Sequence, residues 1–416
     1  MANPYQTKGF LGWIDDRFPL TSMWHHTFSR YYVPVNINFW YCMGSLAILV
    51  LVNQIITGIW LAMFYKPSAA EAFASIEYIM RDVDYGWLLR YLHSTGASFF
   101  FIITYLHMFR GLMYGSYKKP RELVWIFGCV LLLLLMTEAF MGYLLPWGQT
   151  SYWASSVVVS MFGSVPFIGD KLVIFLQGDF YISDASLNKF FAMHIVLIPL
   201  TLLALVGAHI IALHEVGSNN PDGIEIADKK DEKGIPLDGV PFHPYQTSED
   251  LVGFGVFFII FAAIIFYLPT GGGYFLEAAN FEPANPQVTP EHIAPVWYFG
   301  AFYSILRAMT WDWFGISAKL WGVIAMNGAI VMFFILPWLD RSPVKSIRYK
   351  GILFKTALTL FTISFITLTY LGTCALTESV NLWSKIMTFI YFGFFFLMPI
   401  YSKLDKTKPV PERVKR

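Results

Sequence analysis

Four histidines lie in two apolar segments of the chain at nearly equal spacing. His93 and His107 are 14 residues apart, and His194 and His209 are 15 residues apart. An α-helix turns 100° per residue, so 14 residues return to within about 40° of the starting direction and 15 residues to within about 60°. Each pair is therefore expected on roughly one face of its helix, with its two members separated by a rise of about 21 to 22 Å.

The composition predicts that these helices cross a membrane. Hydrophobic residues make up 56% of the 416 residues and charged residues only 14%, whereas a globular domain carries about 25% charged residues. A helix of roughly 20 apolar residues spans the hydrocarbon core. Eight such runs occur: Asn38 to Tyr65, Tyr91 to Phe109, Leu123 to Gly148 with the single acid Glu138, Phe190 to Leu213, Leu251 to Leu276, Leu320 to Leu339, Thr356 to Leu376 and Ile386 to Ser402.

Eight spans place both ends of the chain on one side of the membrane. Segments on the side of the termini hold 21 Lys and Arg residues, and the opposite loops hold 8. Lys and Arg are enriched in cytoplasmic loops, so we expect cytoplasmic termini and outward-facing first, third, fifth and seventh loops. Residues 1–30 lack the apolar core of a signal peptide. The three cysteines lie far apart, which excludes a disulfide framework and a covalent haem motif.

This topology pairs the histidines by depth. The second and fourth spans both run inward, so His93 and His194 share the outer level, and His107 and His209 share the inner level. Two imidazoles facing each other across a bundle can fill both axial positions of a haem iron, which leaves no position for oxygen and favours electron transfer. The alternative is four hydrogen-bonded polar residues in helix interfaces. Ionisable residues inside a membrane are costly and normally functional, which favours two haem sites.

Glycines and arginines support the haem interpretation. Glycine allows a macrocycle to approach the backbone closely, although small residues are also common wherever membrane helices pack. Two glycine pairs repeat the 14-residue spacing of the first histidine pair: Gly44 with Gly58, and Gly128 with Gly142. Arg90 and Arg110 each lie three residues from a histidine and could bind haem propionates, or they could simply anchor the helix at the interface.

The chain divides into two halves around a polar segment. Residues 1–216 contain the four spans that carry the histidines and the paired glycines, and residues 217–250 form a polar cytoplasmic loop. Residues 251–416 contain the other four spans. Two outward loops, Gln149 to Lys189 and about Gly271 to Lys319, are long and apolar enough to contain short interfacial helices. The second includes Ile293 to Leu306, which is too short to span a membrane. Together these loops could cover a pocket between the helices.

Several motifs point to one family. They are Tyr85-Gly86-Trp87 with Arg90 and His93, Arg110 to Ser116, Gly142 to Gln149, His214-Glu215 with Gly217 to Pro221, Pro241 to Tyr245, and Pro283 to Pro286. With these motifs the chain resembles, nearly end to end, bacterial cytochrome b of the cytochrome bc complex, the ubiquinol:cytochrome c oxidoreductase. The resemblance implies an all-α membrane protein of eight transmembrane helices whose N-terminal four-helix bundle holds two non-covalent b-type haems. Ser116 joins the expected haem contacts.

The resemblance also implies a reaction and its partners. Quinol is oxidised at an outer site, and one electron goes to a Rieske iron–sulfur protein, which works with a cytochrome c-type subunit. The other electron passes through the two haems to an inner quinone-reduction site, coupled to proton translocation. A homodimeric complex in the bacterial inner membrane is expected, with quinone and lipid as partners and no nucleic acid.

By position, the outer site should include Tyr143, Pro295, Trp297 and Tyr298. The family's usual Pro-Glu-Trp-Tyr motif reads Pro295-Val296-Trp297-Tyr298 here, so its customary proton acceptor is missing. We hypothesise that Glu291, five residues before Val296, replaces that acceptor. Glu291 as a solvated loop acid, and the aromatic residues as ordinary packing, are the alternatives.

The inner site should use His214 and Asp250 as proton donors to a quinone, with Ser218 as a hydrogen-bonding neighbour. His214 lies five residues past His209, towards the inner surface. Two other functions remain possible: the dihaem anchor of another quinone-linked dehydrogenase, and a non-redox transporter whose histidines bind protons or metal. The anchor would leave the last four spans unexplained, and the transporter would show no haem bands in a reduced-minus-oxidised spectrum.

Overall fold

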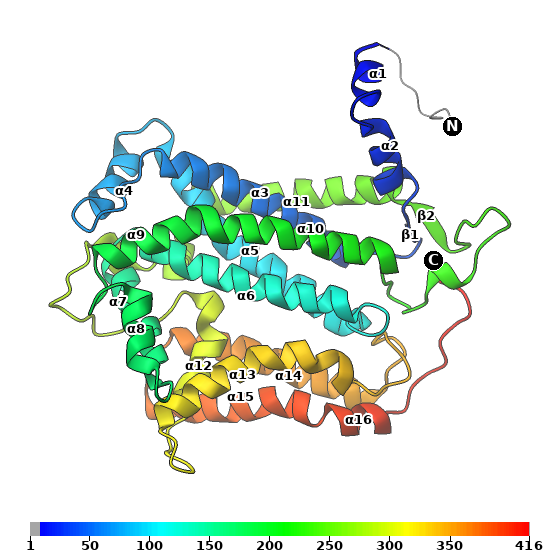
Figure 1. The fold of residues 1–416 in the computed structure, drawn as a ribbon. Helices are drawn as coiled ribbons and strands as arrows, with labels where there is room; N and C mark the ends of the chain where they lie inside the picture. The colour runs from blue at the N-terminus through cyan, green and yellow to red at the C-terminus, as the bar shows by residue number, and fades with distance from the viewer. Residues whose placement is uncertain (1–8, 416) are drawn as a thin grey trace.

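The computed structural model describes residues 9–415, and long helices dominate it (Figure 1). The first group of helices contains α3 (Met43–Ala62), α5 (Gly86–Tyr114), α6 (Glu122–Leu144), α10 (Ile198–Val216) and α11 (Thr247–Tyr267). The second group contains α12 (Gly300–Ala308), α13 (Ala318–Leu339), α14 (Ile352–Thr373), α15 (Glu378–Phe396) and α16 (Met398–Leu404). The two groups lie side by side along their length (Figure 1).

The membrane spans agree with the prediction in number. Within the described residues, seven helices are long and apolar enough to cross a membrane, and α15 with α16, bent by 60°, can supply the eighth. The all-α, multi-pass fold is therefore confirmed. One boundary differs: the fifth predicted span continues to Leu276, but α11 ends at Tyr267. Pro269 has no backbone N–H to donate, and the glycines that follow it adopt left-handed backbone angles.

Short elements gather at the two ends of the bundle. At one end lie the short helices of the loops predicted to face outward, α4 (Ala72–Arg81), α7 (Gln149–Met161) and α8 (Gly169–Gln177) (Figure 1). At the other end β1 (Tyr32–Pro34) pairs antiparallel with β2 (Gly239–Pro241), with Tyr32 opposite Pro241. The C-terminal segment lies near these strands (Figure 1). Each end of the bundle therefore has its own set of connecting loops.

The second half of the short apolar run in the last long outer loop, from Gly300 onward, lies in α12, which is tucked into the bundle. This helix packs against α13, α14 and α15, and its Ile305 and Ala308 are fully buried. Gly300 begins the helix against the backbone of α14, where any side chain on Gly300 would overlap the carbonyl of Thr369. A glycine at this position therefore allows the two backbones to meet.

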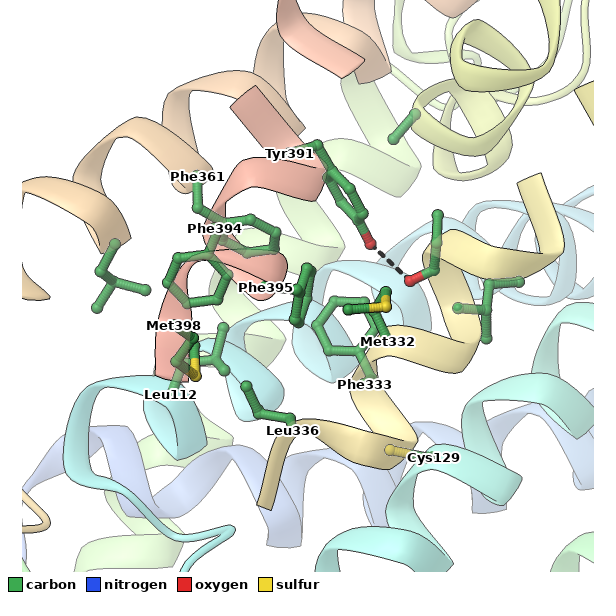
Figure 2. Close-up of a cluster of buried hydrophobic side chains, with 14 of the residues drawn as sticks. Leu112, Cys129, Met332, Phe333, Leu336, Phe361, Tyr391, Phe394, Phe395 and Met398 are labelled. Atoms are coloured by element: carbon green, nitrogen blue, oxygen red, sulfur yellow. Dashed lines mark hydrogen bonds between the residues drawn. The ribbon is translucent and has the colours of Figure 1, made fainter. Parts of the chain in front are cut away.

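One apolar core joins the two helix groups. Figure 2 shows Phe333, Phe361 and Phe395 packed together at its centre, with Tyr391 donating a 2.9 Å hydrogen bond to the carbonyl of Ala329. Leu112 of α5 and Cys129 of α6 belong to the same cluster and are labelled in Figure 2. The second group is therefore held against the first by side-chain packing as well as by loops.

Helix α11 packs with the first group, although the predicted division after residue 250 places it in the C-terminal half. Phe257, Phe261 and Ile265 recur every four residues and so form one face of the helix. This face packs against α3 and α5, where Met43 and Leu46 belong to the same buried cluster. The histidine-bearing helices are therefore covered by a fifth span that follows the cytoplasmic loop.

Candidate functional site

The four histidines come together as two pairs inside the first helix group. Helix α3 packs against α5, and α6 packs against α10, so the histidines of α5, of α10 and of the turn that precedes α10 lie between two helix pairs. The ring centroids of His93 and His194 are 6.1 Å apart, and those of His107 and His209 are 6.5 Å apart. This is the pairing by depth that the topology predicts.

These separations fit a metal ion between each pair of rings. An imidazole nitrogen binds a metal at about 2 Å, and the ring centre lies a little over 1 Å behind that nitrogen, so two axial rings have centroids roughly 6 Å apart. No hydrogen bond to the Nε2 atom of any of the four rings occurs among the described residues. The Nε2 atoms are thus available as ligands.

A π-helical turn explains how unequal sequence spacings produce equal geometry. The segment Met193–Leu197, which contains His194, forms a π-helix between α9 (Asp184–Ala192) and α10. A π turn closes its hydrogen bond over five residues instead of four and so takes up one additional residue. The 15-residue interval from His194 to His209 therefore matches the 14-residue interval on α5.

The outer pair is held by hydrogen bonds on its second ring nitrogens. Nδ1 of His93 lies 2.9 Å from the Thr57 hydroxyl. Nδ1 of His194 lies 3.0 Å from the Glu138 carbonyl oxygen and 3.0 Å from the Glu138 carboxyl oxygen Oε1. A histidine that binds a metal usually donates its other N–H in this way, which fixes the ring and its tautomer.

The inner pair has weaker support from the protein. Nδ1 of His107 is buried without a hydrogen-bond partner among the described residues. His209 faces the backbone of Val124, 14 residues before Glu138, but without good hydrogen-bond geometry for its Nδ1. The two levels therefore differ in how strongly the protein fixes the imidazoles.

Each of the four predicted glycines faces one of the four histidines. A Cβ atom would lie 3.6 Å from the His209 ring if added at Gly128, and 3.4 Å from the His107 ring if added at Gly44. At Gly58 it would lie 3.0 Å from the ring of His93, and at Gly142 it would overlap the ring of His194. The shared spacing thus reflects close ring-to-backbone approaches, which are tightest at the outer level.

The two arginines have unused hydrogen-bonding capacity. Arg110 donates to the Ser116 hydroxyl at 3.2 Å and lies 4.5 Å from the centroid of the Tyr41 ring, but its Nε is buried without a partner. Among the described residues, the Arg90 guanidinium makes no hydrogen bond or salt bridge. A buried, unsatisfied N–H such as the Arg110 Nε is costly, and haem propionates could accept hydrogen bonds from both arginines. The histidines, glycines and arginines therefore fit a haem at each level.

An aromatic cluster lies where the second and third spans meet the last long outer loop. Trp297 donates a 3.1 Å hydrogen bond to Ser98, and the Tyr298 ring stacks on Phe101 with centroids 4.0 Å apart. Tyr143 belongs to the same cluster and donates a 2.7 Å hydrogen bond to the carboxyl group of Glu277. The structure thus brings together three of the five residues expected at the outer site.

The acid in this cluster is not the expected one. Glu291 is exposed, and within the described chain no hydrogen bond or salt bridge joins it to another residue. Glu277 is partly buried beside Tyr143, and Val296 is buried in the cluster. Burial raises the pKa of Glu277, and the hydrogen bond from Tyr143 only partly offsets that effect. Pro295 directly precedes Val296 and is half-buried.

At the inner end, two of the three expected residues meet through a tyrosine. The rings of His214 and Tyr31 stack with centroids 4.1 Å apart, and the Tyr31 hydroxyl lies 3.1 Å from the Ser218 hydroxyl. Asp250 is nearly buried and accepts a 3.0 Å hydrogen bond from Gln246 of the preceding turn. Among the described residues, no hydrogen bond joins Asp250 to His214 or Ser218.

Comparison with known proteins identifies the family. Residues 28–217 match the family model Cytochrome b/b6/petB, and residues 283–392 match Cytochrome b(C-terminal)/b6/petD. A cytochrome b of Allochromatium vinosum is 59% identical over 410 residues, which cover 97% of this chain and 98% of the relative. The chain belongs to the cytochrome b family.

Other relatives agree with this assignment. A cytochrome b of Rickettsia prowazekii is 47% identical over 408 residues, with 98% of each chain covered. A solved structure titled "Hyperthermophilic respiratory Complex III" matches with a TM-score of 0.86 and 39% identity, covering 95% of this chain and 99% of that chain. The chain is therefore a bacterial, multi-pass cytochrome b of the respiratory complex III type, with a haem-binding role in electron transport.

Sequence reasoning missed three polar groups of these sites. Thr57 precedes a predicted glycine within an apolar span, and Tyr31 lies before the first span. Glu277 follows the apolar segment 274–276 in an outer loop. Its position next to this apolar segment is the only feature of the sequence that could have marked it as a site residue. None of the three has a spacing that relates it to the histidines.

Proposed function

We propose that this chain is the haem-binding and quinone-binding subunit of a ubiquinol:cytochrome c oxidoreductase. The single observation that carries the proposal is the pair of facing imidazoles at each of two depths in one helix bundle. The aromatic cluster beside Tyr143 lies at the outer end of that bundle, and the polar group around His214 lies at the inner end. This arrangement suits quinol oxidation on one side and quinone reduction on the other.

We assign His93 and His194 as the ligands of an outer haem, and His107 and His209 as the ligands of an inner haem. A b-type haem with two histidine ligands carries single electrons and has no open position for oxygen. Gly44, Gly58, Gly128 and Gly142 would give the macrocycles access to the helices. Arg90, and Arg110 with Ser116, would bind the propionates.

At the outer site, Tyr143 and Tyr298 would orient the quinol, and Trp297 and Pro295 would form the wall. Tyr298 is suited to donate a hydrogen bond, because burial and then the nearby Glu277 carboxyl raise its pKa and keep the hydroxyl protonated. The hydroxyl of Tyr143 would exchange its hydrogen bond between Glu277 and the bound quinol.

Glu277 is better placed than Glu291 to accept a proton from quinol. Its carboxyl group is held by Tyr143 within the cluster, whereas Glu291 is exposed. A carboxyl group with a raised pKa takes up a proton more readily than one in water and can release it again to the outer surface. Glu277 would thus perform the role that Val296 cannot.

At the inner site, His214 and Asp250 would supply protons to a reduced quinone, and Ser218 would hydrogen-bond to it. Burial raises the pKa of Tyr31, so its hydroxyl remains a hydrogen-bond donor to this site. Tyr31 covers the face of His214, so it would have to move aside, or share the ring face, when quinone binds.

The assembly follows from the same proposal. A Rieske iron–sulfur protein would dock at the outer face to receive one electron, and a cytochrome c-type subunit would accept it. The complex would be a homodimer in the bacterial inner membrane, with both termini of this chain in the cytoplasm. The alternative of a dihaem dehydrogenase anchor is disfavoured, because the second family match extends over residues 283–392 of the C-terminal helices.

The experiment is quinol oxidation by the purified complex. Adding ubiquinol should reduce b-type haem and an added cytochrome c together. Replacing Glu277 with Gln should slow this reaction about tenfold or more, and Glu291→Gln provides the matched control with a near-normal rate. Absence of b-type haem in the complex would overturn the proposed function, whereas a normal rate in Glu277→Gln with a slow rate in Glu291→Gln would reverse the assignment of the acceptor.

A further inference from the structure

Glu138 is an acidic residue within the membrane-spanning helix α6, six residues before its last residue Leu144, and its side chain reaches a histidine ring. Its carboxyl oxygen Oε1 lies 3.0 Å from Nδ1 of His194, and the Glu138 side chain is 16% exposed. The other carboxyl oxygen, Oε2, is buried without a hydrogen-bond partner among the described residues. An acidic side chain at this depth is costly, so a residue of this kind is expected to have a function.

The four expected haem ligands are not equivalent in their second hydrogen bond. Nδ1 of His93 meets a neutral hydroxyl, that of Thr57, and Nδ1 of His107 has no partner in the described part of the chain. His209 faces only the backbone of Val124. His194 alone meets a carboxyl group, in addition to the carbonyl of the same residue.

A carboxylate changes the properties of a ligating histidine. Hydrogen bonds to ionised acceptors are roughly twice as strong as those between neutral groups. A carboxylate that accepts the second N–H of a ligating imidazole orients the ring and raises its basicity as a ligand. A more basic ligand, and a nearby negative charge, both stabilise the oxidised form of iron relative to the reduced form.

We infer that Glu138 is a positioning residue for His194 whose carboxylate lowers the reduction potential of the outer haem. The inference rests on the proposed function, since it requires His194 to be a haem ligand. Lowering the potential of the outer haem but not of the inner haem favours transfer of the electron inward. The same contact holds the His194 ring within the π-helical turn Met193–Leu197.

A merely structural role for Glu138 has a different signature. If the side chain served only to fill space against α10, an uncharged residue of equal size would reproduce its effect. Glutamine has the same shape and keeps a carbonyl oxygen that can accept the Nδ1–H of His194, but it lacks the charge. The substitution Glu138→Gln therefore separates charge from packing.

The experiment is a potentiometric titration of the b-type haems in the purified complex. In Glu138→Gln, the ratio of oxidised to reduced outer haem at a fixed potential should fall about tenfold, which corresponds to an upward shift of about 59 mV for one electron. The inner haem should titrate as in the unmodified complex. Glu138→Asp should recover part of the shift. Glu122→Gln, on the same helix, serves as the control and should shift neither haem.

Electron paramagnetic resonance supplies a second measurement, because the low-spin signal of the outer haem should change in Glu138→Gln and that of the inner haem should not. An outer haem with an unchanged potential in Glu138→Gln would overturn the inference, as would equal shifts of both haems. If Glu138→Gln fails to assemble, the potential of the outer haem in Glu138→Thr tests the inference. Loss of the outer haem in every Glu138 variant would show a structural role for Glu138 instead. A wild-type complex without two b-type haems would refute the proposed function itself.

Discussion

The four glycines that face the histidines predict an order of sensitivity to a single methyl group. Carbon atoms pack best at about 3.5 to 4.0 Å. An alanine methyl at Gly128 would lie 3.6 Å from the His209 ring and one at Gly44 would lie 3.4 Å from the His107 ring, so both need little adjustment. At Gly58 the distance to the His93 ring is 3.0 Å, and at Gly142 the methyl would overlap the His194 ring.

The magnitude follows from how far each ring can retreat. His93 would have to move by about 0.5 Å or more to restore normal contact, but its Nδ1 is held by Thr57 at 2.9 Å. Overpacking of this kind costs about 1 to 3 kcal/mol, which weakens haem binding by roughly 5- to 150-fold. Gly142→Ala should weaken haem binding more than Gly58→Ala does, whereas Gly44→Ala and Gly128→Ala should leave haem binding nearly unchanged.

The assay is the haem content of each purified variant, with the two haems distinguished by redox titration. Outer-level variants should lose the outer haem first and retain the inner haem. Gly207→Ala is the matched control, because it lies on α10 with nothing within 4 Å of an added Cβ. If Gly128→Ala loses as much haem as Gly142→Ala, the link between ring-to-backbone distance and haem retention is refuted.

Three further predictions concern the sites and the loops. Quinol oxidation should slow as pH falls through the raised pKa of Glu277, because only its ionised form accepts a proton, and a steady-state rate profile of Glu277→Gln should lack this dependence. Replacing Lys350 with Met should destabilise the protein by about 3 kcal/mol, because it leaves the buried Asp340 carboxylate without its closest cation. The detergent-solubilised complex should then inactivate at a lower temperature, and an unchanged inactivation temperature would contradict this prediction. Finally, Tyr31→Ala should change the apparent KM for quinone at the inner site by severalfold through exposure of the His214 face, and an unchanged KM would place quinone elsewhere.

The histidine-bearing part of the molecule could be predicted because helical periodicity links residues across a membrane. A 14-residue interval returns to the same helix face, so His93 and His107, and the glycine pairs, could be related to one another before their partners were known. The pairing of histidines between the second and fourth spans then required only the direction of each span. The structure brings His93 next to His194 and His107 next to His209, which is the pairing that the span directions predict.

The parts that could not be predicted depend on local geometry or on distant contacts. No characteristic residue pattern marks the π-helical turn at His194. The 15-residue interval from His194 to His209 therefore indicated only approximately that the two histidines share a helix face. Glu277 reaches Tyr143 across 134 residues of sequence, and no spacing rule connects a loop acid to a helix. The packing of α11 on α3 and α5 likewise depends on which apolar faces fit, because every span in such a protein is apolar.

If the proposed function holds, two pairs of histidines bind two haems at different depths. The most direct test is to measure haem per polypeptide in the purified complex and in the variants His93→Leu and His107→Leu. We expect two b-type haems in the unmodified chain, loss of the outer haem alone in His93→Leu, and loss of the inner haem alone in His107→Leu. Two haems retained in either variant would contradict this expectation.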